Sequence, residues 1–325
     1  MNRRRRRYTG APLWATPRDR PRAPGGRVSV VTPAALCADY PTRLRHRPKH
    51  PAWNQPLEII RPLPRRLAPR LAVFDFDGTL SLIRGGWTDV MVDMMVEHLL
   101  RAPRTDEESS LRQRVLDFVL ELNGQPTIFQ MQRFADELRQ AGAQPAPPEA
   151  YHEEYLHRLG ARIDARKTAI RRGDAAPDDL LVPGSRALLQ SLSERGVELV
   201  LASGTEIESV REEAAILHID HFFAGRIYGP GADPRAFTKL SVMQQALHRR
   251  GIPPEALVGF GDGVVETENA HYLGGVAVGV ASDEIGRSGI PAGWKRHRLI
   301  EAGAHLIVAD YRDPAPLLAW LWDVA

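Results

Sequence analysis

The sequence predicts an α/β fold: a doubly wound parallel sheet with an inserted all-helical cap domain. Five short apolar runs have the length and composition of buried parallel strands, and they cover 71–76, 197–203, 256–261, 275–280 and 305–310. Helical periodicity alternates with the last four runs, over 184–195, 206–217, 236–250, 265–273 and 292–302. Strands and helices that alternate in this way are typical of a parallel sheet with helices on both faces.

The inserted cap follows the first strand, where no strand pattern occurs up to about residue 183. Its first helix begins near Trp87, and the apolar residues that follow recur at the i, i+3, i+4, i+7 spacing of an amphipathic helix. Further helices are expected over 107–122, from 127 onward and over 149–172. We therefore expect a cap domain over 83–183, with glycines near both ends as hinges, and a core domain made of 69–82 and 184–325.

The charge is divided unevenly along the chain. Residues 1–70 contain 17 Lys and Arg but only 3 Asp and Glu, whereas residues 71–325 contain 26 and 37. Because residues 1–68 are rich in proline and lack periodicity, we predict a disordered basic extension. Such a segment is typical of an electrostatic arm for nucleic acid or an anionic surface. The excess of Arg over Lys throughout the chain favours the alternative, a solvated extension or a start placed too far upstream.

Composition excludes several classes of protein. No apolar run reaches 18 residues, so no transmembrane helix is expected, and no apolar stretch of a secretory signal follows the basic N-terminus. The single cysteine, Cys37, excludes a disulfide within the chain and a cysteine-based zinc site. These features favour a cytoplasmic enzyme without a membrane partner, and they leave its oligomeric state open.

Four short segments carry residues suited to phosphoryl transfer, each at a strand end or helix start: FDFDGTL (74–80), LASGT (201–205), FTK (237–239) and GDGVVE (261–266). Each one alone is also typical of a turn, a helix cap or a solvated lysine. Together and in this order they resemble the four motifs of the haloacid dehalogenase-like superfamily in its phosphatase form. The resemblance covers roughly residues 70–325 and implies a Rossmann-like core. It departs from the usual pattern at Glu266, where Asp is more common.

Two aspartates one residue apart suit the two halves of a phosphoryl transfer. Asp75 is the candidate nucleophile that forms an aspartyl-phosphate. Asp77 is the candidate acid and base, which protonates the leaving alcohol and then activates the hydrolytic water. Lys239 is the candidate cation that neutralises both the nucleophile and the phosphate. We expect phosphate contacts from four further residues, namely Gly78, Thr79, Ser203 and Gly204.

The same carboxylates predict a magnesium site, because hard oxygen ligands suit Mg²⁺. Asp75, Asp262 and the backbone carbonyl of Asp77 are its expected ligands. Glu266 follows in the first turn of a helix, where a carboxylate is favoured in any case. It is expected either to contact the metal or to orient Lys239.

The position of the insert, between the first two motifs, resembles the subgroup of phosphoglycolate phosphatase-like enzymes with a helical C1-type cap. That resemblance implies hydrolysis of a small phosphorylated metabolite, either a sugar phosphate or a phosphoglycolate-like acid. Arg84 and Trp87 lie where the chain enters the cap. Arg84 is a candidate for binding a carboxylate or a sugar hydroxyl, and Trp87 for stacking on a sugar. The alternatives are a phosphomutase, or a phosphatase of polynucleotide ends that uses the basic extension.

Overall fold

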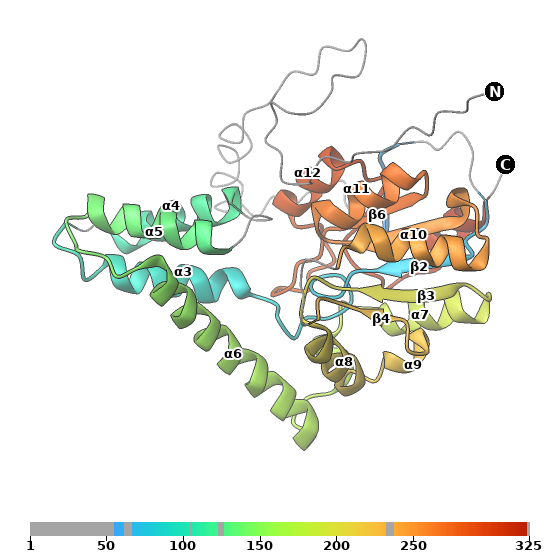
Figure 1. Cartoon of the computed structure of the whole chain (residues 1–325), viewed down its shortest axis with the longest axis horizontal. Helices are drawn as coiled ribbons and strands as arrows, with labels where there is room; N and C mark the ends of the chain where they lie inside the picture. Colours follow the sequence, from blue (N-terminus) through green and yellow to red (C-terminus); the bar gives the residue numbers. More distant parts are fainter. Residues whose placement is uncertain (1–54, 62–66, 105, 123–126, 232–236, 324–325) are drawn as a thin grey trace, which may run out of the picture.

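A seven-stranded sheet forms the centre of the computed structural model, which describes residues 55–61, 67–104, 106–122, 127–231 and 237–323. The strand order is β1-β7-β6-β5-β2-β3-β4. All neighbouring strands run parallel except β1 and β7, which are antiparallel. The strands are β1 (Glu58–Ile59), β2 (Leu71–Phe74), β3 (Glu198–Ala202), β4 (Ile227–Tyr228), β5 (Leu257–Gly261), β6 (Val276–Val280) and β7 (Leu306–Val308). The predicted α/β fold with a parallel sheet is confirmed (Figure 1).

Helices cover both faces of the sheet because successive strand residues point to opposite sides. Leu71 and Val73 of β2 share an apolar cluster with Met243 of α10 (Lys239–Arg250). Ala72 and Phe74, the alternate residues, belong to the main cluster, which includes apolar side chains of α7, α8, α9 and α13. Those helices are α7 (Ser185–Glu194), α8 (Ile207–Ile216), α9 (Asp220–Phe223) and α13 (Ala315–Trp322). The sheet is therefore doubly wound, as predicted.

Two more helices, α11 (Val264–Leu273) and α12 (Gly293–Glu301), pack on strands β5 and β6. A Cβ on Gly259 of β5 would meet the side chain of Ala270, and one on Gly279 of β6 would meet that of Leu299. These contacts place α11 and α12 on the α10 face of the sheet. Short 3₁₀ helices lie at Pro177–Leu180, before α7, and at Pro254–Ala256, before β5. Of these elements, the sequence patterns missed β1, β4, α9 and α13.

In its described residues, the insert after β2 contains four α-helices, which Figure 1 shows grouped beside the sheet. They are α3 (Trp87–Leu99), α4 (Glu108–Glu121), α5 (Thr127–Gln140) and α6 (Pro148–Arg172). Arg162 and Arg166 of α6 donate hydrogen bonds to backbone carbonyls of the linker that leads into α3. Arg162 donates to the carbonyl of Gly86, and Arg166 donates to the carbonyls of Ile83 and Gly85. The linker therefore rests on the last helix of the insert.

Part of the extension that the sequence predicts to be disordered is ordered. Glu58–Ile59 pairs with β7, and the Glu58 carboxylate accepts two hydrogen bonds from the Arg296 guanidinium. A two-residue strand between prolines is too short to show a periodicity, so only the sheet edge that it joins reveals it. The rest of the predicted disorder, over residues 1–54 and 62–66, lies outside the described residues.

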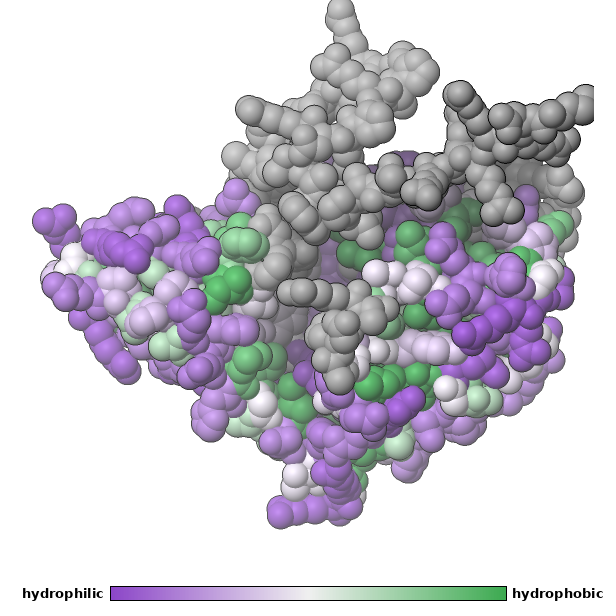
Figure 2. All heavy atoms as spheres, in the orientation of Figure 1, coloured by the Kyte–Doolittle hydropathy of each residue, from purple (hydrophilic) through white to green (hydrophobic). Residues whose placement is uncertain are grey.

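Within the described ranges, no helix is both long and apolar enough to cross a membrane. On the face shown in Figure 2, hydrophilic residues predominate at the outer end of the helical insert, and apolar residues form smaller patches over the sheet unit. This distribution is ordinary for the water-exposed surface of a folded domain.

Candidate active site

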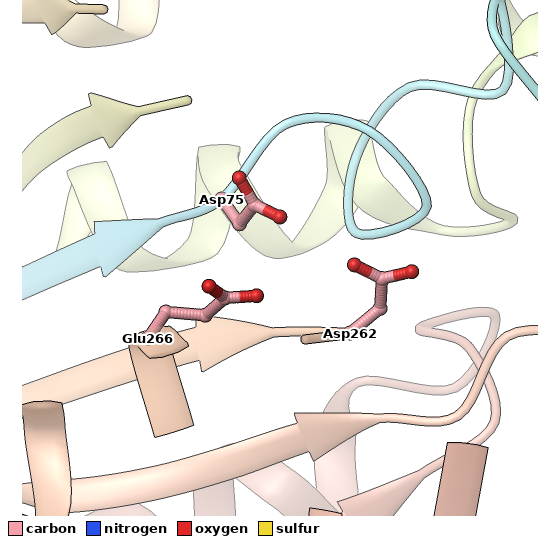
Figure 3. Close-up of side chains that lie close together, drawn as sticks. All are labelled: Asp75, Asp262 and Glu266. Atoms are coloured by element: carbon pink, nitrogen blue, oxygen red, sulfur yellow. The ribbon is translucent and has the colours of Figure 1, made fainter. Parts of the chain in front are cut away.

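Three carboxylates meet at the carboxyl edge of the sheet (Figure 3). Asp75 directly follows β2 and Asp262 directly follows β5, and these two strands are parallel neighbours. Glu266 reaches the same space from the first turn of α11. One carboxylate oxygen from each of the three lies within 4.8 Å of the others. The fold therefore brings together residues that are up to 191 positions apart in the chain.

Lys239, the first residue of α10, lies between two of these carboxylates. Its Nζ atom is 2.6 Å from Oδ1 of Asp75 and 3.0 Å from Oε2 of Glu266. The other oxygen of Glu266 accepts a hydrogen bond from the Gly263 N–H at 2.7 Å. Both oxygens of Glu266 are thus engaged, and its carboxylate fixes the position of the lysine.

The electrostatics of this group follow from its burial. Burial raises the pKa of Asp75 well above its ordinary value, and the charges of Glu266 and Asp262 add to that shift while Lys239 opposes it. Burial alone would also raise the pKa of Glu266, but the charge of Lys239 and the hydrogen bonds lower it below its ordinary value. Burial disfavours the charge of Lys239, yet the two carboxylates outweigh burial and raise its pKa. Lys239 is therefore a permanent cation beside Asp75.

Asp77 is held from two sides. The Thr205 hydroxyl donates to its Oδ2 atom at 2.8 Å, and Nε of Arg84 lies 3.6 Å from its Oδ1 atom. Burial raises the pKa of Asp77, although Arg84 and the hydrogen bond from Thr205 oppose that shift. The Arg84 guanidinium also donates to the buried Glu213 of α8 at 2.7 Å. The sequence patterns did not identify Thr205 or Glu213 as site residues.

The turn after Asp77 passes very close to Asp262. Gly78 has a φ of +73°, and a Cβ on it would lie 2.2 Å from Oδ2 of Asp262, so only glycine fits there. The buried Thr79 hydroxyl accepts a hydrogen bond from the Asp262 N–H at 2.9 Å. The structure thus places Thr79 as a support for Asp262.

The remaining predicted site residues are Ser203, Gly204 and Trp87. Ser203 is buried at the end of β3, and its hydroxyl accepts from the Thr205 N–H at 3.0 Å. Through Thr205 it is linked to Asp77. A Cβ on Gly204 would meet no described atom within 4 Å, so this residue borders open space. Trp87 is partly buried and packs against the main apolar cluster at the start of α3.

Lys295 of α12 is a site residue that the sequence patterns did not reveal. Its Nζ atom lies 2.7 Å from Oδ2 of Asp262, 2.6 Å from Oε1 of Glu284 and 3.1 Å from the Ser282 hydroxyl. Its side chain is 3% exposed. The segment WKRHR has the pattern of a solvent-exposed basic helix, so the sequence does not show that Lys295 contacts buried carboxylates. The feature of the sequence that could have indicated Lys295 is the rarity of lysine, because the chain contains only four.

We expect Lys295→Met to destabilise the metal-free protein strongly. The substitution leaves the carboxylates of Asp262 and Glu284 buried without their cation, and the loss of one partner of a buried ion pair costs about 3–5 kcal/mol. Urea denaturation in the presence of a chelator measures this change. Lys167→Met is the matched control, because Lys167 pairs with the half-exposed Glu212 and its loss should cost at most about 1 kcal/mol. Equal losses in both variants would contradict the expectation.

Three features together define a class of hydrolytic enzyme: the helical insert after β2, the carboxylates that follow the neighbouring parallel strands β2 and β5, and the largely buried lysine between carboxylates. The sequence profile of that class, described as haloacid dehalogenase-like hydrolase, matches residues 69–274. The chain belongs to the haloacid dehalogenase-like hydrolase family and is an enzyme of it. The resemblance found in the four motifs is therefore confirmed. No curated protein sequence matches the chain.

Solved structures with a similar fold include three bacterial proteins. A conserved haloacid dehalogenase-like protein of Agrobacterium tumefaciens is 17% identical, with a TM-score of 0.53 over 78% of this chain and 99% of that one. A hydrolase of the family from Deinococcus radiodurans, with bound phosphate and sodium, is 17% identical, with a TM-score of 0.51 over 79% and 99%. A predicted phosphoglycolate phosphatase of Haemophilus somnus is 18% identical, with a TM-score of 0.50 over 77% and 98%. At these identities the similarity establishes the fold.

Proposed function

We propose that the protein is a Mg²⁺-dependent phosphomonoesterase that acts through an aspartyl-phosphate on Asp75. The observation that carries the proposal is the contact of 2.6 Å between Lys239 and Asp75, in the same carboxylate cluster as Asp262. The charge of Lys239 opposes the rise that burial causes in the pKa of Asp75 and so favours the ionised carboxylate, which is the form that attacks phosphorus. The cation also lowers the repulsion between nucleophile and substrate.

The donor set fits a magnesium ion. One oxygen of Asp75 is held by Lys239 and one oxygen of Asp262 by Lys295, which leaves the second oxygen of each carboxylate for a cation. Burial raises the pKa values of both aspartates, and the charges of neighbouring carboxylates add to the shift, so a bound cation would favour their ionised forms. Together with the backbone carbonyl of Asp77, the carboxylates of Asp75 and Asp262 form an all-oxygen set of ligands, which suits Mg²⁺. The bound ion would neutralise charge on the phosphoryl oxygens. Because both oxygens of Glu266 are engaged, we assign it to orienting Lys239.

Two steps complete the reaction. An oxygen of Asp75 attacks phosphorus, the bond to the leaving oxygen breaks, and Asp77 donates its proton to that oxygen. A water molecule then attacks phosphorus and gives its proton to Asp77, the Asp75–phosphorus bond breaks, and phosphate leaves. The raised pKa of Asp77 helps it to hold the proton that the first step needs. The hydroxyl of Ser203 and the N–H of Gly204 are the proposed contacts to the phosphate oxygens, whereas the predicted Gly78 N–H already donates to the Ser81 carbonyl at 2.9 Å.

The test is phosphate release by the full chain with Mg²⁺, from p-nitrophenyl phosphate and from a panel of sugar phosphates, phospho-acids and 3′-phosphorylated oligonucleotides. Acid quenching during turnover of ³²P-labelled substrate should leave label on the protein, and hydroxylamine should remove it, since it cleaves acyl phosphates. Turnover without any labelled protein would overturn the aspartyl-phosphate. Hydrolysis confined to oligonucleotides would overturn the assignment to small metabolites.

Mg²⁺ should stabilise the protein more at pH 8 than at pH 5. Burial, with Glu284 and Glu266, raises the pKa of Asp262 to about 6 against the opposing charge of Lys295, whereas its ordinary value is 3.8. As the pH rises through this window, the unfolded chain releases its proton before the folded one does, so the metal-free protein loses stability. Mg²⁺ binds the ionised form and offsets that loss. Melting temperatures with and without Mg²⁺ at both pH values measure the difference. Asp262→Asn should remove it, and an equal Mg²⁺ effect at both pH values would contradict this prediction.

A further inference from the structure

Glu213 is a fully buried acidic residue that contacts Arg84 beside the proposed active site. It lies on α8, and one of its carboxylate oxygens, Oε1, accepts a hydrogen bond from the Arg84 guanidinium at 2.7 Å. A buried carboxylate is costly unless it is paired, so this pair is an ionic contact between the core helix and the linker to the insert. Burial raises the pKa of Glu213 to about 7, against the opposing charge of Arg84.

Polar atoms beside the proposed acid Asp77 lack partners. Four buried side-chain atoms in the described part of the chain have no hydrogen-bond partner, and three of them are Oδ1 of Asp77, Nε of Arg84 and Oε2 of Glu213. Oδ1 of Asp77 lies 3.6 Å from Nε of Arg84, and Arg84 contacts Glu213 directly. Buried polar groups in folded proteins are nearly always paired. An acceptor, Oε2 of Glu213, and a donor, Nε of Arg84, are therefore available next to Asp77, the group that protonates the leaving oxygen.

The chemistry of these atoms discriminates between leaving groups. A carboxylate only accepts hydrogen bonds, so it cannot pair with the ionised carboxylate of Glu213. The ion pair with Glu213 also neutralises Arg84, which removes the charge that would attract a carboxylate. An ammonium group only donates and would face the N–H of Arg84. A hydroxyl both donates and accepts, so it alone suits both kinds of atom.

Resting on the proposed phosphatase function, we propose that Arg84 and Glu213 select the leaving group, and that the substrate is a sugar or polyol phosphate with a hydroxyl near the ester oxygen. The hydroxyl donates to Glu213 and accepts from Arg84. The side chains of Arg84 and Asp77 are 23% and 30% exposed, although their unpaired atoms are buried, so the proposal places the leaving group against the exposed part of these side chains. The structure thereby favours the hydroxyl over the carboxylate as the partner of Arg84.

Three two-carbon phosphomonoesters that differ only in their terminal group test the proposal on the unaltered protein. They are 2-hydroxyethyl phosphate, 2-phosphoglycolate and phosphoethanolamine, with p-nitrophenyl phosphate as the reference. We expect kcat/KM for the hydroxyl compound to exceed that for each of the others at least tenfold. Equal or faster hydrolysis of phosphoglycolate or phosphoethanolamine would overturn the proposal. No hydrolysis of any compound, the reference included, would instead overturn the phosphatase function itself.

Glu213→Gln provides the second test, with the neighbouring Glu212→Gln as the matched control. The exchange leaves the Arg84 charge uncompensated, so the KM for 2-hydroxyethyl phosphate should rise and that for phosphoglycolate should fall. The ratio of their kcat/KM values should shift at least tenfold. Glu212 is half exposed and pairs with Lys167 and Arg171, so its exchange should leave the ratio within about twofold. Equal losses on both substrates would reduce Glu213 to a structural role. If Glu213→Gln does not fold, the comparison on the unaltered protein decides the proposal.

Discussion

Asp75→Asn should reduce turnover of every substrate by about 10⁴-fold or more, because an amide does not form the aspartyl-phosphate. The loss should appear in kcat, with p-nitrophenyl phosphate as well as with the best substrate of the panel. The labelled protein species should disappear with it. The fold should persist, because the substitution preserves shape and removes a charge that burial disfavours.

Two controls make this result interpretable. Asp93→Asn exchanges the same residue types on α3, where the side chain is 43% exposed and pairs with Arg112, and it should leave kcat unchanged. The melting temperature of metal-free Asp75→Asn should equal or exceed that of the unaltered protein. A variant that retains turnover within tenfold would show that another residue attacks phosphorus, and the proposed mechanism would be wrong.

Removal of Mg²⁺ should have the second-largest effect. Without the cation, the charges of Asp75 and Asp262 repel the incoming phosphate, and Lys239 alone cannot compensate for both. A catalytic divalent ion contributes several kcal/mol to the transition state, which corresponds to roughly a thousandfold in rate. Excess chelator should therefore reduce phosphate release about a thousandfold, and added Mg²⁺ should restore it.

Calcium is the informative control for that experiment. Ca²⁺ accepts more ligands at longer distances, so it should bind the carboxylates, compete with Mg²⁺ and fail to support turnover. Titration calorimetry on the metal-free protein measures binding apart from activity. Asp262→Asn should weaken Mg²⁺ binding at least tenfold, because the exchange removes one of the two carboxylate ligands. Full activity in excess chelator would refute a metal-dependent reaction.

The sequence by itself determined the class of fold and the chemical centre, because both depend on local patterns. Each apolar run from 71–76 to 305–310 contains a strand of the parallel sheet, since a strand buried on both faces must be apolar throughout. Asp75 directly follows the strand in the first run, and Asp262 directly follows the run 256–261. In a parallel sheet, residues just beyond the ends of neighbouring strands meet at one edge, so their proximity was predictable without coordinates.

Only the tertiary structure decided which residues surround that centre. Lys295 joins Asp262 across 33 positions, and Arg84 joins Glu213 across 129. Neither pair has a local signature, because a lysine in WKRHR and a glutamate in VREEA resemble solvated helix surface. β1 also escaped detection, since two residues show no period. Whether such side chains face water or a buried carboxylate depends on how the helices dock on the sheet and on the linker, and that packing is set by contacts between distant parts of the chain.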